Sequence, residues 1–342
     1  MSNGISVYVG LNCSIDENII LIESAAALGL NRLFTSSIIP ESDNQSEEFA
    51  IVLAAAIENN FEIIMDVTPE TITAFDFEQI ILRLDDGFKP LQIAALSHIR
   101  RIMLNASTVN ERTLNELANL GANFENISAL HNFYPHIFSG LDVSYFKSQN
   151  DLLHKFEIEV GAFIPTLEGI RRLPFCEGLT TLETTRNASV DYSARYLTAL
   201  NTDFVLIADS MPTPEECISL ASISSDKVIF DVNLLTADEV SKELLTKNFY
   251  SRPEISRDVI RAANSRQILT QPIQPDNDPK PRQLGDVTID NSDFGRYAGE
   301  VQIVKSSLPA DPRVNIVAQI VPSDLLFLNS LNTSKNFSFR FV

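Results

Sequence analysis

The chain has 342 residues, of which 44% are hydrophobic and 21% charged, and it carries a formal net charge of −19. This length exceeds what one hydrophobic core usually supports, so we expect a large domain and a smaller one. Nucleic acids and anionic membranes bind basic proteins, so the negative charge argues against both as partners. A small anionic ligand remains compatible, provided that arginines gather at one spot.

No basic segment precedes an apolar run at the N-terminus, and no apolar stretch is long enough to span a bilayer. We therefore predict a cytoplasmic protein and leave a homo-oligomer open. Three cysteines are scattered without paired spacing, which argues against a disulfide framework. Cys13 and Cys217 are expected to be small buried residues, whereas Cys176 stands in a candidate site loop.

Apolar runs of strand length alternate with amphipathic runs of helix length over the first two thirds of the chain, a pattern typical of repeated βα units. The predicted strands are Ile5 to Val9, Arg32 to Ser36, Phe61 to Val67, Gln79 to Leu84, Arg101 to Asn105, Asn126 to Leu130, Glu157 to Ile164 and Phe204 to Ala208. Eight such strands favour a closed (β/α)₈ TIM barrel over residues 1–226. We expect it to be irregular at its third helix, within Thr68 to Glu78.

The predicted helices lie between these strands. They are Ile15 to Leu28, Ser46 to Asn59, Glu111 to Leu120, Ser144 to Lys155, Ser189 to Leu200 and Thr213 to Ser222. Gly29 and Gly121 are expected to end two of them, and Ser46, Ser144 and Thr213 to begin three.

A second, β-rich domain is predicted over residues 227–342. Its expected strands are Val228 to Leu234, Asp286 to Ile289, Glu300 to Val304, Val314 to Val321 and Asn336 to Val342. A helix is predicted from Asp238 to Lys247, and prolines crowd residues 272–281, which indicates an exposed loop.

Polar side chains stand at or just beyond the C-terminal ends of the predicted barrel strands. They are Glu41, Asp66, Asp85, Asn105, His131 and Asp209. In a TIM barrel these ends form one rim, so the six should converge on one pocket. For Glu41 and Asp66 a helix cap is an equally good explanation.

His131 is followed by Asn132, Tyr134 and the stiffening Pro135. An imidazole beside an amide and a phenol favours hydrogen bonding to a sugar, or proton handling.

The long connection from Pro165 to Asn187 supplies further charged groups, among them Glu177, Glu183 and Arg186. Hydrolysis of a glycoside needs two carboxyl groups, and these two glutamates with Asp209 and Asp85 offer several pairs. No metal-binding or phosphate-loop motif appears, so neither a metal nor a cofactor is expected.

Short motifs extend this pattern along nearly the whole chain. They include Phe34-Thr35-Ser36 with Pro40-Glu41, Arg83-Leu84-Asp85, Leu104-Asn105-Ala106-Ser107, His131 to Pro135, Pro174 to Leu179, Thr181-Leu182-Glu183 with Arg186, Ile289-Asp290-Asn291 and Gly295-Arg296-Tyr297. In these motifs the chain resembles the bacterial 6-phospho-N-acetylmuramidases. It departs from their pattern at Val9, His136, Thr180 and Thr185.

The resemblance implies that a cyclophilin-like β-barrel follows the TIM barrel. It also implies hydrolysis of the disaccharide of N-acetylmuramic acid 6-phosphate and N-acetylglucosamine during cell-wall recycling. Arg83, Arg186 and Arg296 lie in matching motifs and are candidates for the anionic substrate. A phosphosugar lyase or isomerase and a non-catalytic sugar-phosphate sensor remain the alternatives.

Overall fold

The computed structural model describes residues 3–36, 46–69, 71–72, 80–84, 87–328, 331 and 335–342. The chain divides into two compact units, each with its own sheet. The first comprises Met1–Leu197 and Asn201–Ser225, and the second Thr198–Leu200 and Asp226–Val342.

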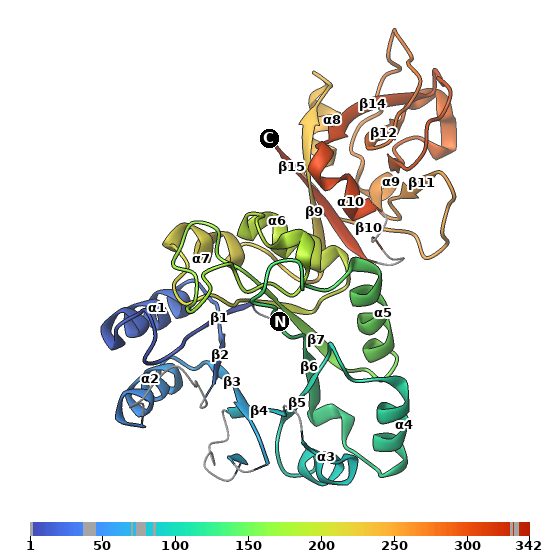
Figure 1. The fold of residues 1–342 in the computed structure, drawn as a ribbon. Helices are drawn as coiled ribbons and strands as arrows, with labels where there is room; N and C mark the ends of the chain where they lie inside the picture. The colour runs from blue at the N-terminus through green and yellow to red at the C-terminus, as the bar shows by residue number, and fades with distance from the viewer. Residues whose placement is uncertain are drawn as a thin grey trace. The chain divides into compact units, whose positions relative to one another are not determined.

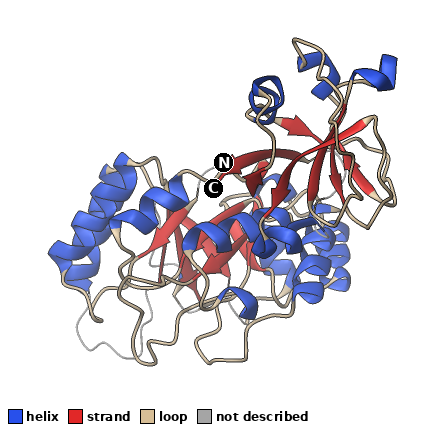
Figure 2. Cartoon of the chain, turned by 90° about the horizontal axis from the view of Figure 1, so that it is seen from above, coloured by secondary structure: helices blue, strands red, loops and turns tan. Residues whose placement is uncertain are grey.

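Eight parallel strands close the first unit into a barrel in chain order, which confirms the predicted (β/α)₈ architecture. The strands are β1 (Gly4–Ser6), β2 (Arg32–Ser36), β3 (Glu62–Val67), β4 (Ile80–Leu84), β5 (Ile102–Asn105), β6 (Ile127–Leu130), β7 (Glu159–Ile164) and β8 (Phe204–Ile207). Helices surround them on the outside (Figures 1 and 2). The predicted irregularity at the third helix falls largely outside the described residues.

The described helices of the barrel agree closely with the predicted ranges. They are α1 (Ile15–Ala27), α2 (Ser46–Glu58), α3 (Pro90–Ser97), α4 (Glu111–Asn119), α5 (Val143–His154), α6 (Val190–Ala199) and α7 (Pro214–Ala221). Helix α3 is not among the predicted helices. It begins after Lys89, whose side chain makes no capping hydrogen bond. The start signals that sequence reasoning missed are Pro90 at the first helical position and Gln92, whose side chain accepts from the Lys89 N–H.

The helix ends confirm most of the predicted signals. Gly29 and Gly121 both have positive φ, and Thr213 caps α7 through a reciprocal capping box with Glu216. The predicted cap at Ser144 is wrong. Asp142 takes that position because its carboxylate accepts from the backbone N–H groups of Ser144 and Tyr145.

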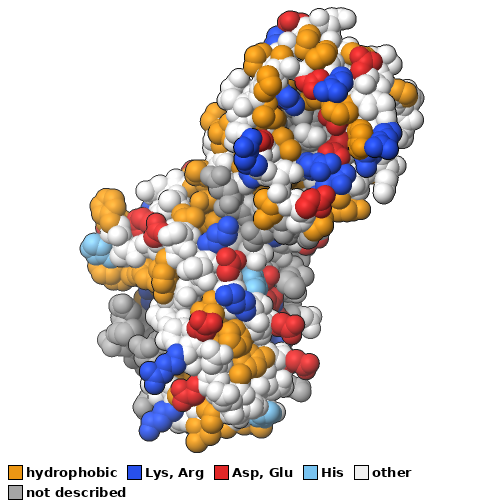
Figure 3. Space-filling model, turned by 90° about the vertical axis from the view of Figure 1, so that its right-hand side faces the viewer, with side chains coloured by type: hydrophobic (Ala, Val, Ile, Leu, Met, Phe, Trp, Pro, Cys, Tyr) orange, Lys and Arg blue, Asp and Glu red, His pale blue; other side chains and the backbone are white. Residues whose placement is uncertain are grey.

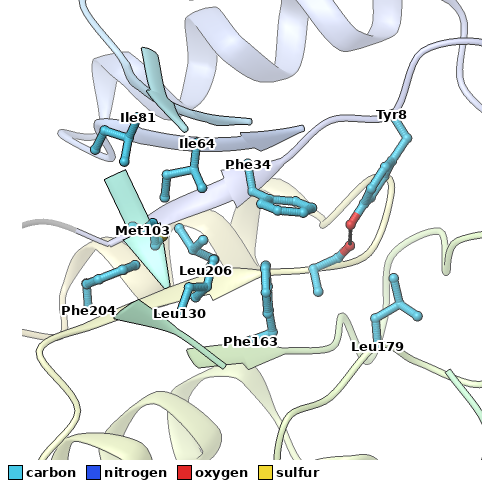
Figure 4. Packing of buried hydrophobic residues seen from close by; sticks show 11 residues of the cluster. Tyr8, Phe34, Ile64, Ile81, Met103, Leu130, Phe163, Leu179, Phe204 and Leu206 are labelled. Atoms are coloured by element: carbon cyan, nitrogen blue, oxygen red, sulfur yellow. Dashed lines mark hydrogen bonds between the residues drawn. The ribbon is translucent and has the colours of Figure 1, made fainter. Parts of the chain in front are cut away.

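The barrel interior is filled by one apolar cluster, seen from close by in Figure 4. Its members include Tyr8, Phe34, Ile64, Ile81, Met103, Leu130, Phe163 and Leu206. The rings of Phe34 and Phe163 meet edge to face with centroids 5.0 Å apart, and the half-buried Phe133 packs on both. The barrel is therefore a packed core, and any site must lie on top of it.

The second unit is built on a seven-stranded sheet in the order β10-β15-β9-β14-β12-β13-β11. These strands are β9 (Lys227–Leu234), β10 (Phe249–Tyr250), β11 (Val259–Arg261), β12 (Asp286–Asp290), β13 (Val301–Val304), β14 (Val314–Ile320) and β15 (Asn336–Phe341). Its helices of four or more residues are α8 (Glu239–Leu245), α9 (Ser265–Ile268), η4 (Ser292–Tyr297) and α10 (Leu325–Leu328). The predicted exposed loop at 272–281 is confirmed, since it holds no strand or helix and is mostly exposed.

Charged groups of both signs are interspersed on the face of the second unit seen in Figure 3. Beneath the surface, the Glu300 carboxylate is 2% exposed and accepts from Arg252 and Arg261. Asp290 is 4% exposed, and its backbone N–H donates a hydrogen bond to the carbonyl of Glu300. Burial, with the nearby Glu300 charge, raises the pKa of the Asp290 carboxyl to about 7.

Candidate active site

Strand alternation builds a polar layer directly above the apolar cluster of the barrel. Residues two apart on a strand share a face, so each position two residues beyond a cluster member also points inward. Those positions are Ser36, Asp66, Arg83, Asn105 and Asn132, which follow Phe34, Ile64, Ile81, Met103 and Leu130. They lie at the C-terminal ends of β2 to β6, the end at which barrel enzymes carry their chemistry.

Arg83 lies at the centre of this layer and is only 4% exposed. Its Nη1 donates to Asp66 Oδ1 at 2.7 Å, and its Nη2 donates to Asn132 Oδ1. Its Nε is buried and has no hydrogen-bond partner among the described residues. Two neighbours thus fix the guanidinium while one strong donor stays unused.

Tyr8 adds a phenol to the same end of the barrel, and sequence reasoning gave it no role. Its hydroxyl donates to the carbonyl of Ala208 at 2.8 Å, the bond drawn as a dashed line in Figure 4. The Arg172 guanidinium stacks 4.6 Å from its ring centroid. Burial raises the pKa of Tyr8, so the hydroxyl stays protonated. The available signal was its position at the end of the first predicted strand.

His131 follows an inward-facing residue and so points outward, toward α5. It is fully buried, with Nε2 2.9 Å from Asn150 Oδ1 and Nδ1 3.1 Å from Ser107 Oγ. Burial lowers its pKa to about 4, so the ring is neutral. The Ser107 hydroxyl also accepts from the backbone N–H of Asn132 at 2.9 Å. We therefore propose that His131 positions Asn132, in place of the two roles that the sequence favours, hydrogen bonding to a sugar and proton handling.

Asp209 anchors the long connection after β7. Its carboxylate is fully buried and accepts three backbone N–H bonds, from Thr166 and Leu179 at Oδ2 and from Arg172 at Oδ1. Burial raises its pKa, while the three N–H groups pull it down. All three donors belong to the connection itself, so one side chain holds its start and two points further along it.

Glu183 and Arg186 form a clamp within the same connection. The Glu183 carboxylate accepts from Arg186 Nε and Nη2 at 2.7 and 2.6 Å, and from the N–H groups of Phe138 and Gly140. The hydrogen bond to Arg186 and these two N–H groups lower its pKa to about 2. Arg186 is 3% exposed, and its remaining N–H groups donate to the carbonyls of Tyr134, Gly178 and His136. No guanidinium donor of the clamp is left for a phosphate.

Glu177 differs from the other loop carboxylates because it is only lightly engaged. It is half-buried, and within the described part of the chain it accepts one hydrogen bond, from the N–H of Ile137 at 3.2 Å. Its neighbours Cys176 and Gly178 both have positive φ, which turns the chain sharply around it. Cys176 is exposed, whereas Cys13 and Cys217 are buried as predicted.

The remaining candidate residues form no comparable cluster among the described side chains. Asn105 Oδ1 accepts from the N–H of Ser107, and the Tyr134 backbone pairs with Thr180. Arg296 lies in η4 of the second unit, where it is exposed and stacks 4.8 Å from the ring of Tyr297. Glu41 and Asp85 lie outside the described residues. In the described ranges no group of three or more acidic, histidine or cysteine side chains is placed to hold a metal.

Two of the departures from the family pattern contact each other. Thr180 and Thr185 are fully buried, and their hydroxyls are 2.8 Å apart. One hydroxyl donates to the carbonyl of Leu182 and the other donates either to that carbonyl or to the first hydroxyl. The pair therefore satisfies its own hydrogen bonds inside the loop.

An eight-stranded parallel barrel with a polar layer at its C-terminal mouth defines the class of TIM-barrel proteins. Both units identify the family within that class. The N-terminal model of 6-phospho-N-acetylmuramidase matches residues 3–222 and the C-terminal model matches residues 228–340, so the chain belongs to this family.

Two solved structures are similar to the chain over nearly its whole length. An uncharacterized B. cereus protein is 28% identical, with a TM-score of 0.83 and 99% of each chain covered. A conserved Enterococcus faecalis protein of unknown function is also 28% identical, with a TM-score of 0.62, covering 100% of this chain and 96% of that one. No curated protein sequence matches the chain. None of the helices described here has the length and apolar character to cross a membrane.

Proposed function

We propose that this protein is a cytoplasmic glycosidase that cleaves the bond between N-acetylmuramic acid 6-phosphate and N-acetylglucosamine in cell-wall recycling. The family match over both units supports the substrate class. The observation that carries the proposal is the buried Arg83, which Asp66 and Asn132 hold and whose Nε has no partner within the described ranges. A protein at −19 needs such a short, directed contact to bind an anionic sugar.

Arg83 is our choice for the phosphate or lactyl carboxylate of the substrate. The sequence favours Arg186 first and Arg296 second for the phosphate contact, but the five N–H groups of Arg186 already donate within the clamp. Asn132, beside Arg83, has an amide that suits a sugar hydroxyl or acetamido group. Asn105 and Tyr134 are proposed as outer contacts of the same ring, and Arg296 and Glu41 remain further proposals for substrate binding.

Glycoside hydrolysis requires a carboxyl group that protonates the leaving oxygen and a second that attacks or activates water. Among the described candidates we assign the first role to Glu177, because most of its hydrogen-bonding capacity is unused. Asp66 and Asp85 are the candidates for the second role. Glu183 and Asp209 are proposed to shape the loop, since each already accepts three or more hydrogen bonds.

The direct test is incubation of the purified protein with the phosphorylated disaccharide and its unphosphorylated counterpart. Hydrolysis of the first to two free sugars is expected, with much poorer turnover of the second. A lactate-free or unsaturated product would identify a lyase, and binding without turnover would identify a sensor. Either result would refute the glycosidase assignment.

Variants separate the proposed roles. Glu177→Gln should lower kcat by roughly 10²-fold or more, as expected for loss of a general acid. Glu168→Gln, at an exposed position of the same connection, is the matched control and should leave kcat unchanged. Arg83→Met should lower kcat/KM by about 10- to 100-fold on the phosphorylated substrate, the usual cost of losing a charged hydrogen bond. An equal loss on both substrates would refute the phosphate contact.

A further inference from the structure

Two turns beside Glu177 display large apolar side chains to solvent. One turn carries Ile137 and Phe138, and the other carries Phe175, two residues before Glu177. Phe138 is 86% exposed and Phe175 is 59% exposed, and both belong to the loops that follow β6 and β7 at the mouth of the barrel. The N–H of Ile137 donates to Glu177 Oε2 at 3.2 Å, so the two turns meet at this carboxylate. Exposed apolar side chains are therefore present in both turns that contain or contact the proposed general acid.

Phe138 is the least expected of these residues. Its φ is +66°, in the left-handed region that glycine and asparagine adopt most readily. An exposed turn also favours a polar side chain over an aromatic one. Phenylalanine meets neither preference, so backbone conformation and packing give no reason for it here. Residues held in this conformation cluster at functional sites, which favours a binding role for the ring.

The backbone of the turn around Phe138 is firmly held. Its N–H donates to Glu183 Oε1 at 2.9 Å, and the N–H of Gly140 donates to Glu183 Oε2 at 2.7 Å. Arg186, which binds the same carboxylate, also donates to the carbonyl of His136. The clamp of Glu183 and Arg186 thus fixes the backbone, while the phenyl ring stays open to solvent. An aromatic side chain on a fixed backbone loses little conformational freedom when a ligand binds.

The position of Glu177 decides which part of the substrate meets this surface. A general acid protonates the oxygen of the leaving group, so the leaving sugar lies directly beside its carboxyl group. In the proposed reaction the leaving sugar is N-acetylglucosamine, which carries no charge. The C–H groups on one face of a pyranose ring pack against the electron-rich face of an aromatic ring. An exposed phenylalanine beside the general acid therefore suits this half of the substrate.

We propose that Phe138, with Phe175 on the adjoining turn, forms the platform on which the uncharged leaving sugar stacks. The inference rests on the proposed function and divides recognition between two surfaces. Arg83 binds the anionic half of the disaccharide, whereas the two exposed rings bind the N-acetylglucosamine half. A change at Phe138 should therefore weaken binding of the leaving sugar and leave recognition of the phosphate intact.

Fluorescence can detect the contact without turnover. The chain contains no tryptophan, so Phe138→Trp gives it a single indole at the proposed platform. Titration with N-acetylglucosamine should shift the emission of this variant, because the sugar covers the indole and excludes water from it. Tyr250→Trp, at an exposed aromatic position of the second unit, is the matched control and should not respond.

Kinetics on two substrates test the same contact in the reaction. Phe138→Ser should raise KM for the phosphorylated disaccharide about 5- to 10-fold, since covering one ring face gives about half the stabilisation of burying a whole phenylalanine. KM for the methyl glycoside of N-acetylmuramic acid 6-phosphate, which lacks the leaving sugar, should not change. Phe138→Tyr keeps an aromatic ring and should retain both wild-type values. Because position 138 is exposed, these variants should keep the wild-type Tm.

Emission of Phe138→Trp that the sugar leaves unchanged, or a normal KM for the disaccharide in the double variant Phe138→Ser, Phe175→Ser, would overturn the platform; hydrolysis by the wild type would still support the glycosidase. An equal rise in KM for the methyl glycoside would also overturn it. If the double variant changes only the oligomeric state, the rings form a contact between copies and the proposal is wrong. Sugar binding that depends on Phe138, in a protein that hydrolyses nothing, would refute the glycosidase function and support the platform.

Discussion

Neutralising Glu183 should destabilise the protein far more than it slows any chemistry. The folded pKa of this carboxyl is about 2, against an ordinary 4.5, because Arg186 and two backbone N–H groups hold its charged form. A difference of about 2.5 pKa units corresponds to about 3 kcal/mol of stability at neutral pH. The side chain is 29% exposed, so this figure is an upper bound. Arg186 would also be left as an unpaired buried charge, a loss typically of about 3–5 kcal/mol.

The assay is urea unfolding of wild type, Glu183→Gln, Arg186→Met and the double variant, with turnover measured in parallel. Because the folded pKa is depressed, the contribution of Glu183 is complete above pH 4.5 and is lost as pH falls toward 2. About 2 kcal/mol of it should be gone by pH 3. The double variant should lose less than the sum of the single losses, because neither charge is then stranded. If Glu183→Gln is as stable as wild type but loses 10²-fold in turnover, the structural role of the clamp is refuted and Glu183 is a reacting group.

Three further predictions concern titration and chemistry. His131 has a depressed pKa of about 4, so its contribution to stability is full above about pH 6.5 and falls as pH drops toward 4. His131→Gln should flatten this fall of Tm with pH, and His98→Gln, at an exposed position, should not. Asp290 has a raised pKa of about 7, so its contribution to stability is present below pH 3.8 and is lost as pH rises through 7. Asp290→Asn should therefore have a higher Tm than wild type at pH 8. A difference in Tm between variant and wild type that is the same at pH 5 and pH 8 would contradict this. Turnover should survive chelators and omission of reductant, and its abolition by a chelator with recovery on adding one divalent ion would reveal a metal site.

The barrel could be predicted because its strands are apolar runs of regular spacing, and all eight lie where such runs occur. The positions of Asp66 and Asn105 at the C-terminal ends of β3 and β5 also followed from the strand pattern. The opposite directions of His131 and Asn132 follow from the alternation of side chains along a strand, which turns Asn132 inward and its neighbour His131 outward. Grouping both residues at one rim overlooked this alternation. The pairing of Glu183 with Arg186 and the anchoring by Asp209 depend on loop conformation, which no periodicity encodes. The short strands β10 and β11 were missed because two or three residues carry no pattern.

The order of strands in the second unit has a consequence for synthesis on the ribosome. Strand β15, residues 336–341, lies between β10 and β9 and pairs in parallel with β9 along six residues. The barrel strands, by contrast, are all translated by residue 207. The first unit can therefore fold while the ribosome is still elongating, whereas β9 waits for more than 100 further residues before that partner emerges. A premature stop codon just before β15 would leave β9 with an open edge, which nascent-chain chaperones and proteases recognise.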